Sequence, residues 1–234
     1  CFDLWEEIIG WHFYTRVVQL KFLKEISTYK QLLEPFLTIS EDLSKKFVFL
    51  QDNLLHHKGG DCIISSFDKH GNIIRVDDAS ILLAFCHIDF DKSIVKLFGF
   101  ERIFKNACNL ENSFKKKYDI DDLELIGRYE GDAYYDGQIW ILCSLALAQI
   151  YFHFNYLDNY EYLYFLGKKI LKKVVSLNKD LDLAEQYNPK TEEFCSAEKL
   201  TWNYSELYFT KILWPDFTIH SLNKVLYKYL NRNR

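Results

Sequence analysis

Methionine is absent from this 234-residue chain, and proline and glycine are scarce, with 3 and 9 residues. Proline interrupts helices, so its scarcity allows long uninterrupted ones. Hydrophobic residues make up 49% of the chain and aromatic residues 17%, which excludes disorder for most of it and supplies a packed core. The length fits one large domain, or part of one, over residues 1–234. Because the chain lacks Met and opens on Cys1, we expect a fragment or a processed product.

An excess of positive charge is also missing. Lys and Arg number 29 against 33 Asp and Glu, a formal net charge of -4. Nucleic-acid-binding proteins carry a basic field, so a nucleic-acid partner is not expected. The most apolar stretch, residues 139–150, contains Ser144 and Gln149 and is shorter than the roughly 20 residues of a membrane span. It predicts a buried helix, and no membrane partner is expected.

The six cysteines are scattered, without a CxxC pair and without histidines at zinc-ligand spacing. A structural metal site is therefore not expected, and the disulfide state and the compartment stay open. The sequon Asn203-Tyr204-Ser205 falls inside a predicted helix, where a glycan would be hard to place. We interpret it as a chance match.

Apolar residues recur at helical spacing from about residue 13 to 33, where Pro35 ends the helix. A second helix is predicted to begin at the cap Ser40 and to end near His56. Two stretches, 62–67 and 72–76, alternate like strands but are too few to build a sheet, so the predicted class is all-α. Further helices are predicted at about residues 78–87, 99–117, 137–154, 158–177, 196–213 and 219–230.

The predicted helix at 137–154 is apolar on nearly every face, so other helices must cover it all round. In an all-α protein, a double ring gives inner helices this character and leaves the outer helices amphipathic. The long loops would then gather at one end and carry function.

Three loop-to-helix junctions combine carboxylates, arginine and tryptophan, the mixture that a sugar site needs. The first lies at residues 3–7, the second at 127–135, and the third at 184–187 followed by 200–204. Each alone has an ordinary explanation. Acidic residues near a helix N-terminus offset the macrodipole, Arg128 and Asp132 have the spacing of a salt bridge, and Trp202 has the character of a core residue.

Together and in this order, the three junctions resemble the glucoamylases, inverting glycoside hydrolases that remove glucose from the non-reducing ends of starch and glycogen. The family's Asp-Leu-Trp-Glu-Glu is matched at residues 3–7, and its Arg-Tyr-x-x-Asp-x-Tyr-Tyr at 128–135. Gly-x-x-Trp is matched at 137–140, Ala-Glu-Gln at 184–186 and Leu-Thr-Trp-x-Tyr at 200–204. The resemblance implies an (α/α)6 barrel.

The resemblance also implies a two-carboxylate mechanism without a cofactor. Glu6 matches the general acid, and Glu185 the general base that activates water. An inverting enzyme holds such a pair roughly 6.5 to 9.5 Å apart. Repulsion from Asp3 and Glu7 would favour the protonated form of the acid. The remaining matches are substrate-binding positions, where Trp5 and Trp202 line the glucose pocket: Asp3, Trp5, Glu7, Arg128, Asp132 and Trp202.

Some positions depart from the family pattern. Ile9, Gly131 and Ile139 replace other residue types, although none of them is a carboxylate position. The chain begins at the general-acid segment, so we expect an incomplete barrel that lacks about the first five helices. The early Arg-Asp pair that binds the terminal glucose in the family is missing with them.

Three hypotheses follow from the resemblance. The chain is an active enzyme on an α-glucan, an inactive truncated remnant, or a carbohydrate-binding or interaction module. Truncation would expose inner helix faces and favour self-association. Cleavage of α-1,6 bonds stays open, as does action on trehalose or dextran. The resemblance implies a secreted or vacuolar protein.

Overall fold

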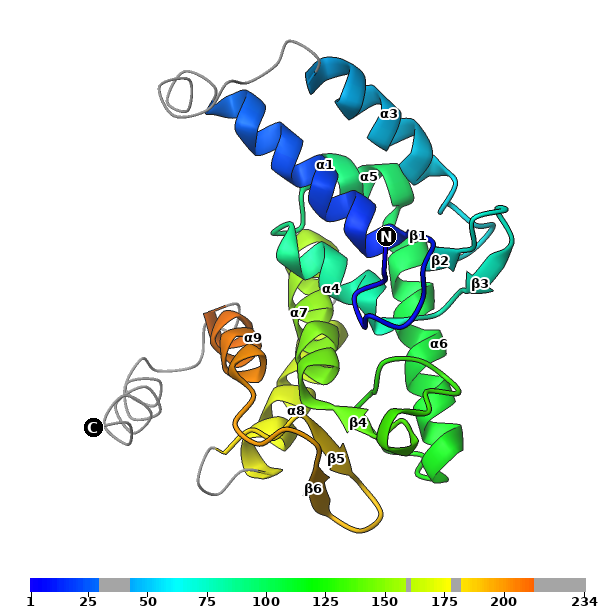
Figure 1. Ribbon diagram of the computed structural model, residues 1–234. Helices are drawn as coiled ribbons and strands as arrows, with labels where there is room; N and C mark the ends of the chain where they lie inside the picture. The colour runs from blue at the N-terminus through cyan, green and yellow to red at the C-terminus, as the bar shows by residue number, and fades with distance from the viewer. Residues whose placement is uncertain (30–42, 159–160, 178–181, 213–234) are drawn as a thin grey trace, which may run out of the picture. The chain divides into compact units, whose positions relative to one another are not determined.

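The computed structural model describes residues 1–29, 43–158, 161–177 and 182–212 (Figure 1). It divides into two compact units, residues 1–109 and 110–234. Within the described residues, no helix is long and apolar enough to cross a membrane.

In the first unit, helix α1 packs against both α3 and α4. A three-stranded antiparallel sheet, ordered β1-β2-β3, lies beside this helical core (Figure 1). The elements are β1 (Trp11–His12), α1 (Phe13–Thr28), α3 (Leu43–Leu55), β2 (Ser66–Phe67), β3 (Ile73–Arg75), α4 (Ala79–His87), α5 (Lys92–Phe98) and α6 (Phe100–Tyr118), which continues beyond residue 109.

In the second unit, α7 packs against both α8 and α9. A second antiparallel sheet is ordered β4-β5-β6. Along the chain, β4 directly precedes α7, and β5 and β6 lie between α8 and α9. The elements are a 3₁₀ turn (Tyr134–Asp136), β4 (Ile139–Trp140), α7 (Ile141–Asp158), α8 (Glu161–Leu177), β5 (Gln186–Asn188), β6 (Glu193–Cys195) and α9 (Thr201–Ile212).

Helix α7 confirms the predicted buried helix, because every residue from 141 to 150 is buried. Its polar members are satisfied internally, as burial of polar groups requires. The Ser144 hydroxyl donates to the Ile126 carbonyl at 3.1 Å, and the Gln149 amide donates to the Glu206 carboxylate at 2.7 Å. Helix α7 can therefore be enclosed without leaving these polar groups unpaired.

Several predicted elements need correction. The strand candidates do build a sheet, because β1 and β3 flank β2. The predicted helix at 137–154 begins only at Ile141, since Gly137 adopts a left-handed conformation (φ 59°) and β4 follows it. Helix α9 begins at Thr201 rather than near residue 196, and α5 was not predicted. The predicted helix end at Pro35, the cap at Ser40 and the helix at 219–230 lie outside the described residues.

Histidine 57 is a fully buried polar residue of the first unit, 0% exposed. Its ring contacts Phe13 and Phe67 edge-on, and its Nδ1 lies 2.7 Å from the Ile64 carbonyl oxygen. Arg16 Nη1 approaches Nε2 at 3.5 Å. Burial, aided by the Arg16 charge, lowers the pKa of His57 to about 4. The ring is therefore neutral near pH 7, with Nδ1–H as the donor to Ile64.

This histidine makes the stability of the first unit depend on pH. Unfolded, His57 takes up a proton as the pH falls below 6.5, whereas the folded state resists protonation down to about pH 4. We expect the free energy of unfolding to fall by about 3 kcal/mol across that window, at about 1.4 kcal/mol per pH unit. Urea titrations at pH 7, 5.5 and 4 measure this dependence.

Substitution isolates the contribution of His57. His57→Gln keeps a donor for the Ile64 carbonyl but cannot be protonated, so the slope between pH 6.5 and 4 should flatten by one proton. His70→Gln is the control, because His70 is exposed. A slope that His57→Gln leaves unchanged would contradict the assignment.

Candidate active site

The predicted acid lies in residues 2–9, which we call the acid loop. An isolated bridge between Phe2 and Ile9 closes the loop, and the Asp3 amide donates to the Ile8 carbonyl at 2.9 Å. Asp3 Oδ1 accepts the amides of Glu7 and Ile8, at 2.8 and 3.2 Å. Glu6 is exposed and adopts a left-handed conformation with φ 61°. The loop therefore folds around the Asp3 carboxylate, with Glu6 at the surface.

Two residues further along the chain anchor the acid loop. Asp78 caps the N-terminus of α4, and its Oδ1 also accepts the Trp5 indole N–H at 3.0 Å. The Arg75 guanidinium lies 2.7 Å from Asp78 Oδ2, 3.4 Å from Asp3 Oδ2 and 3.7 Å from Glu7 Oε2. The first unit thus brings Asp3, Trp5 and Glu7 into one network. Asp3 and Trp5 are buried in it, whereas Glu7 is exposed.

The predicted base, Glu185, directly precedes β5 in the second unit. Its backbone is held from both sides: its carbonyl accepts the Ile141 amide at 3.2 Å, and its amide donates to the Ala197 carbonyl at 2.8 Å. The Ser196 hydroxyl donates to Glu185 Oε2. Burial, and then the charge of Glu185, raises the pKa of the Cys195 thiol, which keeps this neighbour protonated. The carboxylate is therefore oriented by the fold and accepts a hydroxyl donor.

Arg128 and Asp132 form a bidentate ion pair. Arg128 Nε donates to Asp132 Oδ2 at 2.7 Å, and Nη2 donates to Oδ1 at 2.5 Å. Both residues are buried, 3% and 5% exposed. The guanidinium carbon lies 5.3, 5.2 and 4.9 Å from the ring centroids of Tyr129, Tyr134 and Trp140. Ion pairing and cation–π contacts together fix the orientation of Arg128.

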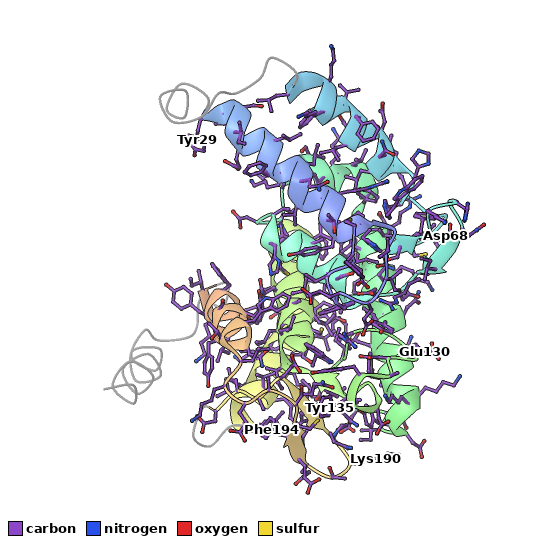
Figure 2. All side chains as sticks on the ribbon, viewed as in Figure 1. Tyr29, Asp68, Glu130, Tyr135, Lys190 and Phe194 are labelled. Atoms are coloured by element: carbon purple, nitrogen blue, oxygen red, sulfur yellow. The ribbon has the colours of Figure 1, made fainter. Side chains whose placement is uncertain are left out.

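Tyr134 connects this pair to the predicted base. One face of its ring contacts Arg128, and its hydroxyl lies 3.1 Å from Ser196 Oγ, which in turn binds Glu185. Residues 128–134 and 185–196 therefore form one connected arrangement in the second unit. Figure 2 labels two exposed aromatic residues of this unit, Tyr135 from the 3₁₀ turn and Phe194 from β6.

Trp202, the last of the predicted pocket residues, lies half-buried in the first turn of α9. The start of this helix is bound to the segment just before Glu185, because the Asn203 amide donates to the Ala184 carbonyl at 2.8 Å and the Leu200 amide to the Leu183 carbonyl at 3.0 Å. Asn203 is 0% exposed. A glycan at Asn203 is incompatible with this burial, which supports the chance-match interpretation of the sequon.

Arg75, Asp78 and Ser196 hold the candidate site residues in place but were not predicted from the sequence. Asp78 carried a signal, since it stands at the start of the predicted helix 78–87. Ser196 stands at the start of the predicted helix 196–213, but that position gives no sign of its contact with Glu185, and Arg75 carried no signal. Across the described ranges, no three or more His, Cys, Asp or Glu side chains gather in a way that could hold a metal ion.

Comparison with solved structures shows the fold. A glucoamylase from Hormoconis resinae matches with a TM-score of 0.72 and 17% identity, over 92% of this chain and 44% of that one. A family 15 glucoamylase from Hypocrea jecorina matches with a TM-score of 0.71 and 20% identity, over 91% and 43%. A glycosidase in complex with glucose gives a TM-score of 0.63 at 16% identity, over 91% and 54%.

The chain thus spans less than half the length of the two glucoamylases. Its mostly helical fold corresponds to part of their (α/α)6 barrel, which confirms the predicted fold class. The family model described as glycosyl hydrolases family 15 matches residues 1–158. This match covers more than half of the chain, which belongs to glycosyl hydrolase family 15.

Proposed function

We propose that residues 1–234 form part of a glucoamylase-like catalytic domain that hydrolyses terminal α-1,4-linked glucose from the non-reducing ends of α-glucans and releases β-D-glucose. The observation that carries the proposal is the arrangement around Glu185. A carboxylate held by the backbone and by Ser196 is connected through Tyr134 to the enclosed Arg128–Asp132 pair. Family 15 membership supports the same reaction class.

In this proposal, two carboxyl groups move the protons of one displacement. Glu6, exposed in the acid loop, donates its proton to the glycosidic oxygen as the bond to the anomeric carbon breaks. Glu185 accepts a proton from the water molecule that attacks the anomeric carbon from the opposite face. At the end of the reaction, Glu6 is ionised and Glu185 is protonated. A proton exchange with solvent restores both groups.

We propose direct and indirect roles for the other predicted substrate-binding residues. Arg128 and Asp132, whose mutual geometry is fixed, would hold sugar hydroxyls near the scissile bond, together with the exposed carboxylate of Glu7. Trp202 would contribute an apolar surface to the glucose pocket. Trp5 is 9% exposed, so only a small part of its ring could contact substrate. Asp3, with both carboxylate oxygens already in contact with protein groups, would act mainly by shaping the acid loop.

Secretion or delivery to a vacuole belongs to the same proposal, since an α-glucan substrate would be met there. A hydrolase with these residues needs no cofactor in the proposed reaction, because water is the nucleophile and the two carboxyl groups carry the protons.

The substrate is tested by incubating the 234-residue chain with maltotriose and, in parallel, with cellotriose, which has the opposite anomeric linkage. We expect glucose and maltose from maltotriose and no product from cellotriose. Maltotriose labelled at its reducing end should yield unlabelled glucose first, because glucose is released from the non-reducing end. Binding of maltotriose without hydrolysis would favour the carbohydrate-binding hypothesis, and neither binding nor hydrolysis would favour the inactive remnant.

A further inference from the structure

We propose that Arg75 is the positioning residue of the acid loop: it holds the Asp3 carboxylate in place, and through it the backbone that presents Glu6. The inference concerns an arginine distant in sequence from the loop, and its catalytic consequence rests on the proposed function. The contacts themselves are independent of that function.

The Arg75 guanidinium faces three carboxylates at once. Nη1 lies 2.7 Å from Asp78 Oδ2 and 3.4 Å from Asp3 Oδ2, and Nη2 lies 3.7 Å from Glu7 Oε2. The three carboxylates come from two parts of the chain, the acid loop and the N-terminus of α4. One side chain therefore connects both parts of the network.

Two of these carboxylates are buried together with most of the Arg75 side chain. The side chains of Asp3 and Asp78 are only 5% and 1% exposed, and that of Arg75 is 13% exposed. Buried carboxylates are costly unless they are paired and hydrogen-bonded. The planar guanidinium, with its forked donors, can serve two carboxylates at once, which an ammonium group does less well. Arg75 thus places one positive charge against two buried carboxylates, Asp3 and Asp78.

The two carboxylate oxygens of Asp3 have different partners. Oδ2 faces Arg75, while Oδ1 accepts the amides of Glu7 and Ile8. Without Arg75, the Asp3 carboxylate would gain by turning toward water, and both amides would lose their acceptor. Glu6, directly before these amides, has a left-handed φ of 61°. A non-glycine residue keeps such a conformation only where its surroundings impose it.

Arg75 is itself supported by regular secondary structure. It ends β3 and pairs with Ser66 of β2, so its backbone belongs to the sheet rather than to a free loop. Asp78, which binds the Trp5 indole, also begins α4. The acid loop is therefore anchored to a sheet through Arg75 and to a helix through Asp78.

Hydrogen–deuterium exchange on the full chain tests the proposal without requiring activity. In Arg75→Gln, we expect the amides of Glu7 and Ile8 to exchange at least about tenfold faster, the lower end of the factor that corresponds to losing one hydrogen bond to a charged acceptor, here the Asp3 carboxylate. Exchange in α1 should stay unchanged. In Arg75→Lys, which keeps the charge but not the fork, we expect a smaller acceleration. Arg102→Gln is the matched control, because Arg102 binds the carbonyls of Gly59 and Phe98.

Two results would overturn the proposal. One is unchanged exchange at Glu7 and Ile8 in Arg75→Gln. The other is equal acceleration throughout residues 1–109, which would mean that Arg75 only stabilises the unit. If Arg75→Gln fails to fold, Arg75→Lys decides the question. Wild-type protection of the Glu7 and Ile8 amides in Arg75→Lys would contradict the proposal, and faster exchange confined to these two amides would support it.

Kinetics provide the functional readout. With maltotriose, Arg75→Gln should lower kcat at least about tenfold and change KM less than about threefold, because the proton donor is displaced while other binding groups remain. Arg75→Lys should recover part of kcat. If the wild-type chain releases no glucose, the proposed function fails, while the exchange experiment still decides the role of Arg75.

Discussion

Replacing Glu185 with glutamine is expected to lower kcat for maltotriose about a thousandfold, within the range of 10² to 10⁴ that a general base contributes. Glutamine keeps the size of the side chain and can still accept the Ser196 hydroxyl, so the local structure should persist. It cannot accept a proton from water. The loss should therefore appear in kcat, with KM nearly unchanged. Steady-state glucose release from maltotriose measures both parameters.

Glu193→Gln is the matched control for this prediction. Glu193 lies in β6, eight residues beyond Glu185, and is exposed. We expect kcat within about twofold of the wild-type value. If Glu185→Gln retained most of the activity, Glu185 would not be the base, whatever the behaviour of the control. An equal loss in both variants would point to a disturbed hairpin instead of missing chemistry.

Removing the negative charge of Asp132 should produce the largest stability effect among the site residues. Asp132→Asn leaves the buried Arg128 guanidinium without its charged partner, and breaking a buried pair in this way costs about 3 to 5 kcal/mol. The contacts of Arg128 with Tyr134 and Trp140 recover little of this, because cation–π contacts contribute up to about 2 kcal/mol and are already present in the wild type. Urea unfolding followed by far-UV circular dichroism measures the change.

An exposed ion pair provides the control. Asp182 and Lys199 lie 3.9 Å apart, with side chains 47% and 56% exposed. Asp182→Asn should change the free energy of unfolding by less than about 1 kcal/mol. A loss below about 1 kcal/mol in Asp132→Asn would show that Arg128 is compensated by other groups and would contradict the account of the enclosed pair.

How far the sequence predicts this fold depends on the length of each pattern. The run at 139–150 is apolar on all sides, so a fully buried helix could be predicted, and α7 confirms it. Strand-like alternation is visible only at residues 62–67 and 72–76, which contain β2 and β3. Strands β1 and β4 have two residues each, too few for a visible alternation, so neither sheet was predicted. Helix α5 has seven residues, about two turns, which is too few to reveal a period.

In the candidate site, too, the sequence predicts some residues, whereas only the structure shows the contacts that support them. Its carboxylates, Arg128 and the tryptophans could be named because their order along the chain resembles a family. The supporting contacts could not, since they join residues far apart in sequence: Arg75 meets Asp3 over 72 positions, and Ser196 meets Glu185 across a hairpin. Burial also limits which roles a residue can take. Asp3 and Trp5 were predicted to bind substrate, but each already binds protein groups.

The charges around the predicted acid include an arginine that the sequence did not predict there. Two neighbouring carboxylates were expected to repel the charge of Glu6. The carboxylates of Asp3 and Glu7 both lie near the positively charged Arg75 guanidinium. One positive charge therefore lies against three carboxylates, Asp3, Glu7 and Asp78, and reduces the repulsion that would act on Glu6 without cancelling it. Positioning of Glu6 by the loop, rather than local repulsion alone, becomes the main feature to test.

The configuration of the first glucose released tests the two-carboxylate account most directly. Proton NMR of maltotriose during the first minutes of reaction, before mutarotation, distinguishes the two anomers. Attack by water activated by Glu185 on the face opposite to the departing group predicts β-glucose as the initial product, shifting slowly to the equilibrium mixture. Initial α-glucose would mean retention of configuration, and it would contradict the assignment of Glu6 as acid and Glu185 as base in a single displacement.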